Sequence, residues 1–348
     1  MLVQRLLETT KSILLKVVFC KLFHVKECNT IKLGNRRQKV GVNGTYSNWN
    51  SVLSGVPQGS VLGPLLFVIY INDLDVDIVS KLSKFADDTK LARGVGSDLE
   101  AKSLSDDLNK IYQSSVDWEM LFNTEKCTVM HMGSDNKKRE YLLGEKLLKK
   151  SKQESDLGVV MDSSGKPSLQ CIKAVKNANV ILGMIKRNIV FRSKLVVIKL
   201  YKALVRLRLE YCVQAWSPYV KKEIMMLERV QRRATRLIEG FKKHDYETRL
   251  RKTGLISLEK RRVRGDPIQV FKMFKGFEKI DYSKFFKLSG NDTRGHSYKL
   301  EKSRSRSERR KNFFSQRVVN AWNKLPQQVV DAETKDCFKN RLDKFGKF

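Results

Sequence analysis

The amino-terminal part of the chain is almost free of acidic residues. No aspartate precedes Asp73, and Glu8 and Glu27 are the only glutamates before it. A site that holds two Mg²⁺ ions roughly 3.5–4 Å apart needs several carboxylate oxygens, contributed by different strands. The sequence therefore lacks an upstream carboxylate that could complete such a site with acidic residues further along the chain.

Long hydrophobic runs are also missing. The longest apolar run, residues 61–71, is well short of the ~20 residues that cross a membrane as a helix. Residues 1–20 superficially resemble a signal peptide, but Lys11 and Lys16 interrupt them and no small-residue cleavage site follows. We therefore expect an intracellular protein, nuclear or cytoplasmic, with no membrane partner.

The cysteines are few and dispersed. The six occur at positions 20, 28, 127, 171, 212 and 337, with no Cys-x-x-Cys spacing and no histidine pair nearby. This spacing is typical of reduced, buried thiols and excludes a disulfide framework or a zinc site of the usual pattern.

Basic residues are abundant, and they are unevenly distributed. The formal charge is +32, of which residues 1–150 carry 22 basic and 17 acidic side chains (+5) and residues 151–348 carry 47 and 20 (+27). A field of this size favours a polyanionic partner, although charge alone does not separate nucleic acid from an anionic membrane surface. The second half is the part expected to face a polyphosphate.

The hydrophobic pattern predicts an α+β region followed by a helical one. Residues 1–33 show weak helical periodicity, and Asn43-Gly44 is a strong hairpin signal. Further elements are expected as follows: a buried helix over 63–74 with Pro64 in its first turn, a hairpin over 82–92, a helix over 98–121, strands over 127–132 and 157–161, and a turn over 162–165. Past 168 the period is helical, with one stripe formed by Ile172, Val175, Asn179, Leu182 and Ile185. The last helical pattern, Phe314, Val318, Trp322 and Leu325, ends at Pro326.

A helix over 223–238 is predicted to present two different faces. Leu227, Val230, Ala234 and Leu237 share one side at helical spacing. The opposite side carries Arg229, Arg232, Arg233 and Arg236. This helix can pack by its apolar side and offer the arginines to phosphates. A second basic stretch, residues 294–317, has nine Lys or Arg against two Glu and includes residues 303–307, which have the composition of a mobile loop.

Two adjacent carboxylates, Asp87 and Asp88, stand between short apolar segments. Successive strand residues point to opposite faces, so both can approach one metal pair only if the backbone turns there. An isolated Asp-Asp pair is more often ordinary turn chemistry. The preceding loop, residues 54–60, favours a catalytic role for the two carboxylates. Its glycines allow close approach of a ligand, and Gln58 can hydrogen-bond a nucleotide or template strand.

At this point the chain resembles a known family. Residues 54–64 (SGVPQGSVLGP), 70–74 (YINDL) and 85–89 (FADDT) are similar to the central motifs of reverse transcriptases of LINE-type, Jockey-like non-LTR retrotransposons. The similarity continues through residues 122–127 (FNTEKC), 156–159 (DLGV), 209–212 (LEYC), 231–235 (QRRAT) and 322–326 (WNKLP), and so covers about nine-tenths of the chain.

The resemblance implies roles for particular residues. Asp87 and Asp88 would be the catalytic, metal-binding pair for Mg²⁺ or Mn²⁺, with Asp87 the more direct ligand. Pro57, Gln58 and Gly59 would form the loop near the incoming nucleotide and template. Lys126 would protonate or stabilise the leaving pyrophosphate; without the resemblance it is a plain surface lysine. Residues 157–158 would belong to the primer-grip strand.

The same resemblance implies a domain organisation. We expect a lead-in over 1–33, a partial right-hand polymerase palm over 34–165, a helical thumb over 166–240 and a basic, mainly helical carboxyl-terminal region over 241–348. The expected substrates are an RNA template, a DNA primer or target and deoxynucleotides.

Departures from the family pattern matter as well. The family's first catalytic aspartate lies in an apolar strand before the region matching Arg36 to Gln38, and the chain has no aspartate there. Fingers, half of the palm, the endonuclease and a zinc knuckle also have no counterpart. We therefore expect a truncated, catalytically deficient remnant of an RNA-directed DNA polymerase that binds metal weakly. The alternatives are a non-catalytic RNA- or DNA-binding protein and a chain without function.

Overall fold

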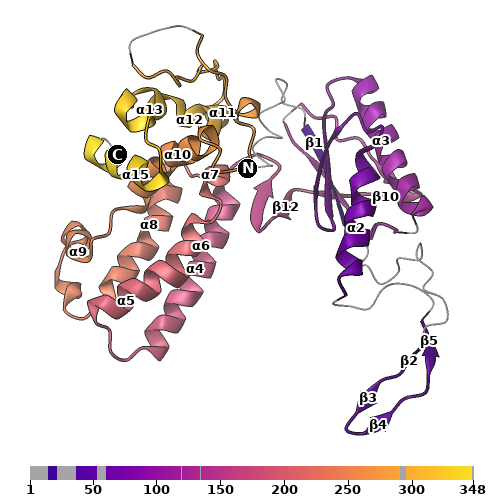
Figure 1. Cartoon of the computed structure of the whole chain (residues 1–348), viewed down its shortest axis with the longest axis horizontal. Coiled ribbons are helices and arrows are strands. Elements are labelled where there is room, and N and C mark those ends of the chain that lie inside the picture. The colour runs from indigo at the N-terminus through magenta and orange to yellow at the C-terminus, as the bar shows by residue number, and fades with distance from the viewer. Residues whose placement is uncertain are drawn as a thin grey trace. The chain divides into compact units, whose positions relative to one another are not determined.

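The computed structural model describes residues 15–21 (backbone only), 37–52, 60–118, 120–133, 135–290 and 295–346. They divide into two compact units, one within residues 9–154 and the other within residues 155–348. The first contains a sheet with helices and the second is mainly helical (Figure 1). The predicted α+β class is confirmed.

A five-stranded mixed sheet is the centre of the first unit. Its order is β11-β8-β1-β7-β6, and every neighbouring pair is antiparallel except β8 and β11. The strands are β1 (Leu15–Lys21), β6 (Lys81–Phe85), β7 (Asp88–Gly94), β8 (Thr128–His131) and β11 (Lys149–Ser151). The weak helical pattern over 1–33 does not hold for residues 15–21. These seven residues form β1, which pairs with a strand on each side.

Helices pack against this sheet through one apolar core. They are α2 (Leu62–Asn72), the short 3₁₀ helix η1 (Asp73–Asp75) and α3 (Asp98–Asp117). Leu104, Leu108 and Ile111 of α3 are fully buried, as their helical spacing predicts. Ser97 and Glu100 form a capping box that fixes the start of α3.

The helix predicted over 63–74 forms, but it is not buried. Tyr70 is the buried residue of α2, whereas Leu65 and Val68 keep more than half of their surface exposed (53% and 59%). The residues of this helix are apolar on every side, so periodicity could not show which side packs. An expectation based on apolar character alone was therefore wrong for one face of α2.

Four very short strands form a two-stranded ribbon before α2 (Figure 1). They are β2 (Arg37–Gln38), β3 (Gly41–Val42), β4 (Thr45–Tyr46) and β5 (Asn50–Ser51), paired β2 with β5 and β3 with β4. Asn43 and Gly44 occupy the turn with positive φ angles of 50° and 83°. The predicted Asn-Gly hairpin is therefore confirmed.

Two further hairpins follow: β9 (Leu142–Leu143) with β10 (Lys146–Leu147), and β12 (Gln153–Asp156) with β13 (Val159–Asp162). Leu157 and Gly158 form the turn of the second hairpin, with φ angles of 46° and 82°. This corrects the strand expected over 157–161, which begins only at Val159, because Leu157 and Gly158 have left-handed backbone conformations.

Helices account for most of the second unit. Their bounds are α4 (Ser168–Asn188), α5 (Lys194–Leu200), the π-helical segment η2 (Tyr201–Val205), α6 (Arg206–Glu210), α7 (Val213–Trp216), α8 (Lys221–Arg236), η3 (Phe241–Lys243), α9 (Tyr246–Thr253), α10 (Leu258–Phe274), η4 (Tyr282–Lys284), α11 (Glu308–Lys311), α12 (Phe314–Arg317), α13 (Val319–Asn323), α14 (Gln327–Val330) and α15 (Lys335–Phe345). One apolar core joins α4 to the helices up to α10.

The stripe predicted for α4 is displaced around the helix. Leu182 and Ile185 are buried as expected, but Ile172 is half exposed. The buried positions of the first half are Gln170 and three residues with small side chains, Cys171, Ala174 and Ala178. Small residues allow close approach of neighbouring helices, and a pattern based on large apolar side chains did not count them.

A second apolar core belongs to residues 270–345. Phe314, Val318, Trp322 and Leu325 are all buried in it, which confirms the last helical pattern. Residues 301–306 form no helix or strand.

Trp322 and Asn323 fasten the chain segment 296–300 to this core. The Trp322 indole Nε1 donates to the Tyr298 carbonyl oxygen at 2.7 Å, and the Trp322 carbonyl lies 3.0 Å from His296 Nε2. Asn323 accepts from the backbone N–H of Leu300 (2.9 Å) and donates to its carbonyl (2.8 Å). Trp322 and Asn323 therefore stabilise the position of residues 296–300.

The unfolding free energy is expected to fall as the pH drops below about 6.5, partly because of His296. Burial lowers the pKa of this imidazole from its ordinary value, and its Nδ1 accepts from the Tyr298 N–H (3.2 Å), which requires the neutral form. At acidic pH the unfolded chain therefore binds more protons than the folded chain. The contribution of His296 to the unfolding free energy is complete above the pKa of the unfolded chain and decreases as the pH falls below it. Urea unfolding at pH 7.5 and pH 5 measures this. His296→Gln should reduce the difference between the two pH values, and an unchanged difference would contradict the assignment.

Candidate catalytic hairpin and arginine face

Asp87 and Asp88 lie at the tip of the hairpin formed by β6 and β7. Phe85 pairs with Asp88, so Ala86 and Asp87 are the two residues of the turn. Ala86 has a φ angle of 47°, a left-handed conformation that reverses the chain sharply. The backbone therefore turns where the two carboxylates need it to turn, and both side chains are partly buried.

β1 is the next strand beside this hairpin. It pairs antiparallel with β7 in a register that sets Lys21 opposite Asp88 and Cys20 opposite Thr89. The strand reads LKVVFCK and contains no aspartate or glutamate. The position next to the carboxylate pair, where a third carboxylate would be sought, is therefore occupied by a strand without one.

Lys84 connects the hairpin to the end of α2 by hydrogen bonds. Its Nζ donates to the carbonyl oxygens of Ile71 (2.7 Å) and Asn72 (3.0 Å). The same Nζ lies 2.9 Å from Asp75 Oδ1, and this hydrogen bond is the main reason that the pKa of Asp75 is lowered. A cation at the carboxyl end of a helix is favoured by the helix dipole. Sequence reasoning missed this lysine, because only the folded chain brings it to those carbonyls.

Metal ligands are scarce around the hairpin. In the part of the chain that the structure describes, no group of three or more His, Cys, Asp or Glu side chains could hold a metal ion. Asp87 and Asp88 alone do not make the oxygen cage that two Mg²⁺ ions require. These residues therefore do not fit a complete two-metal site.

The other residues expected at this site are distributed as follows. Lys126 is exposed in the turn before β8, where its N–H donates to the Asn123 carbonyl at 3.0 Å. Pro57, Gln58 and Gly59 lie outside the described residues.

The four arginines predicted to share one face of α8 do so. Arg229, Arg232, Arg233 and Arg236 are exposed, whereas Leu227, Val230 and Ala234 on the other side are buried. Arg233 donates to Asn179 Oδ1 (2.9 Å), and the Arg232 guanidinium lies 4.6 Å from the centre of the Tyr246 ring. Burial, and next the charge of Arg236, lower the pKa of nearby Arg249. We call these four residues the arginine face.

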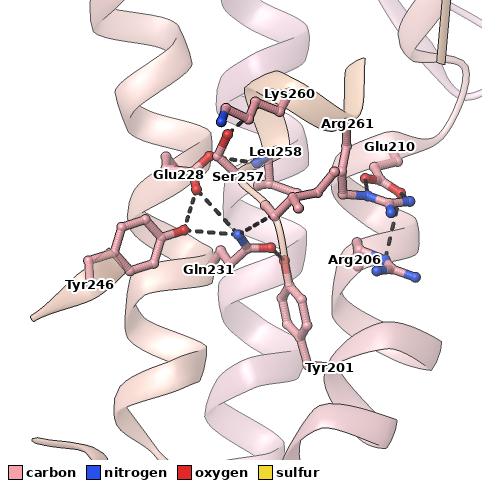
Figure 2. Close-up of polar contacts among 11 residues, drawn as sticks. Tyr201, Arg206, Glu210, Glu228, Gln231, Tyr246, Ser257, Leu258, Lys260 and Arg261 are labelled. Carbon is pink, nitrogen blue, oxygen red and sulfur yellow. Dashed lines mark hydrogen bonds and ion pairs between the residues drawn. The ribbon is translucent and has the colours of Figure 1, made fainter. Parts of the chain in front are cut away.

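A buried polar network holds α8 in its rotation (Figure 2). Gln231 accepts from the Tyr201 hydroxyl at 2.6 Å and donates to the Tyr246 hydroxyl at 2.9 Å. Glu228 accepts from that hydroxyl and, at 2.9 Å, from the Leu258 N–H at the start of α10. Burial raises the pKa of both tyrosines above its ordinary value. Turning α8 would break these bonds inside the core, so the arginine face is fixed toward solvent.

The network also accounts for polar residues that the sequence did not explain. Gln231 is fully buried, and Thr235 accepts from Arg249 Nε at 3.1 Å. Both lie in residues 231–235 (QRRAT), where the sequence predicted a role only for the arginines. A polar residue at a buried helical position is the signal that could have located this network, because such a residue needs hydrogen-bond partners.

Comparison with known proteins identifies a family model and two curated relatives. Residues 12–160 match the family model described as "Reverse transcriptase (RNA-dependent DNA polymerase)", and this range includes β1. The "RNA-directed DNA polymerase from mobile element jockey" of Drosophila melanogaster is 36% identical over 104 residues, which are 27% of this chain and 11% of that protein. The "Probable RNA-directed DNA polymerase from transposon X-element" of the same organism is 46% identical over 61 residues, 16% of this chain and 7% of that protein. The matched segments thus span about a tenth of these relatives' own length.

Proposed function

Because the chain belongs to the reverse transcriptases of LINE-type, non-LTR retrotransposons, we propose that it retains parts of the palm and thumb of an RNA-directed DNA polymerase but is deficient in nucleotidyl transfer. In this proposal residues 34–165 form part of the palm together with β1, and residues 166–240 form the thumb. The substrates of the parent activity are an RNA template, a DNA primer and deoxynucleotides.

One observation carries the proposed deficiency. The strand paired with the Asp88 strand has no carboxylate, and its residue opposite Asp88 is Lys21. A lysine in the sequence at that register position adds no oxygen ligand of the kind that Mg²⁺ prefers. In this proposal, two-metal transfer lacks its bridging ligand for this reason.

Asp87 and Asp88 are expected to bind Mg²⁺ or Mn²⁺ only weakly, in the millimolar range, because two adjacent carboxylates supply too few oxygen ligands. Calorimetric titration with Mn²⁺ measures this affinity. Asp87→Asn should abolish it, whereas Asp106→Asn, at an exposed position of the same unit, should not. Lys21→Asp should raise the affinity about tenfold by adding a ligand opposite Asp88.

Lys21→Asn is the matched control, since it removes the positive charge without adding a carboxylate. If Lys21→Asn raised the affinity as much as Lys21→Asp, repulsion would explain the weak binding and the missing ligand would not. Tight stoichiometric binding to the unaltered chain would mean that the chain supplies another ligand.

The second candidate function is non-catalytic binding of RNA or DNA. The arginine face favours it, because four exposed guanidinium groups on one side of a helix concentrate positive charge that attracts backbone phosphates. Primer extension on an RNA template separates this candidate from a polymerase. Salt-dependent binding separates it from a chain that has no nucleic-acid partner.

A further inference from the structure

A cavity of about 410 Å³ in the second unit has basic side chains at four of its eight lining residues. Lys202 and Arg206 border it from one side, and Arg261 and Arg264 of α10 border it from another. Asp343 of α15 completes the charged lining. Neither the arginine face nor the carboxylate hairpin contributes to it.

The spacing of these residues explains why they meet. Lys202 lies in the π-helical segment η2 and Arg206 is the first residue of α6, four positions later. Arg261 and Arg264 are three positions apart on α10, so they also share a side of their helix. π-Helical turns are rare and are frequently found at functional sites.

The charges around the cavity are only partly balanced. Arg261 binds Glu210 through two nitrogens at 2.5 and 3.0 Å, and Arg206 Nε lies 3.7 Å from the same carboxylate (Figure 2). Arg264 is paired in the same bidentate way with Asp343, at 2.5 and 2.8 Å. Four cationic side chains therefore face two carboxylates. Burial, and then the charge of Arg261, lower the pKa of Arg206, as expected for guanidinium groups that share one anion.

We propose that this cavity binds a phosphate group. A phosphate dianion would balance the two surplus positive charges, and its oxygens match the fork of a guanidinium such as that of Arg206. The volume lies within the roughly 300–1,000 Å³ of ordinary ligand pockets. This site is separate from the proposed polymerase function and would remain if that function were disproved.

The phosphate could come from a free polyphosphate or from an oligonucleotide. Pyrophosphate serves as the probe for the first source. A short single-stranded oligonucleotide, with and without a 5′-phosphate, serves for the second. Competition of each oligonucleotide with pyrophosphate identifies the source, and competition by the phosphorylated form alone indicates a terminal phosphate.

Calorimetry at low ionic strength with the full chain tests the proposal. The double variant Lys202→Gln, Arg206→Gln should bind pyrophosphate at least tenfold more weakly than the unaltered chain. The matched control Lys242→Gln, Lys243→Gln removes the same charge from exposed positions of η3 and should change the affinity by less than twofold.

Ile256→Glu keeps the test decisive if the double variant does not fold. Ile256 lines the cavity and is 43% exposed, so the substitution adds a negative charge there without disturbing the core. It should also weaken pyrophosphate binding. Equal weakening by the η3 control, or undiminished binding in a folded Lys202→Gln, Arg206→Gln variant, would overturn the proposal, as would the absence of binding to the unaltered chain.

Discussion

Purified chain is expected to leave a DNA primer unextended on an RNA template, in Mg²⁺ and in the more permissive Mn²⁺. The hairpin presents Asp87 and Asp88, but its partner strand sets Lys21 opposite Asp88. A bridging ligand that supplies about 4 kcal/mol of transition-state stabilisation corresponds to about a thousandfold in rate. Primer extension with labelled deoxynucleotides measures this loss.

Asp87→Ala provides the background for that assay, because it removes one of the two remaining carboxylates. Extension by the unaltered chain above this background would show that a substitute carboxylate, or a second chain, completes the site, and the proposed deficiency would then be wrong. Equal, negligible signals from both proteins are the expected result. Lys21→Asp is informative in the same assay, since any extension that it restores must depend on the carboxylate opposite Asp88.

Replacing all four residues of the arginine face by glutamine should strongly weaken nucleic-acid binding and its dependence on salt. Each phosphate contact contributes about 0.9 to the slope of log affinity against log salt concentration for duplex DNA. Losing four contacts should therefore reduce the slope by about 3 to 4, and the affinity at 0.1 M salt about a hundredfold to a thousandfold. Fluorescence anisotropy over a series of salt concentrations gives both quantities.

A control variant distinguishes the effect of the arginine face from the effect of total charge. Lys242, Lys243, Lys275 and Lys279 are exposed cations of the same unit that do not belong to the arginine face. Their replacement by glutamine removes the same charge and should change the slope by less than 1. If both quadruple variants gave the same slope, binding would depend on the overall charge of residues 151–348, and the arginine face would have no special role.

Local elements of the candidate site could be predicted from the sequence. The turn at Ala86-Asp87 and the strands beside it follow from apolar segments that flank a short polar tip. The two sides of α8 follow from the 3.6-residue period, since positions three and four apart share a side wherever the helix lies. Both patterns are confirmed because each is set by residues that are close in sequence.

Contacts between distant segments could not be predicted in this way. Three such contacts join residues that no local pattern relates. They are the pairing of Lys21 with Asp88, the hydrogen bonds from Lys84 to the end of α2, and the polar network around Gln231. The exposure of one side of α2 could not be predicted either, because apolar character does not show which segments a helix will pack against.

The sequence by itself determined the family resemblance, the hairpin that carries Asp87 and Asp88, and the side of α8 on which the arginines lie. Only the tertiary structure decided that β1 is the strand beside the hairpin, that buried hydrogen bonds fix α8, and that Lys202, Arg206, Arg261 and Arg264 surround one cavity. The physical reason is range. Periodicity and turn chemistry act over a few residues, whereas the choice of strand neighbours and the balance of charge in a cavity depend on which segments meet when the whole chain buries its apolar surface.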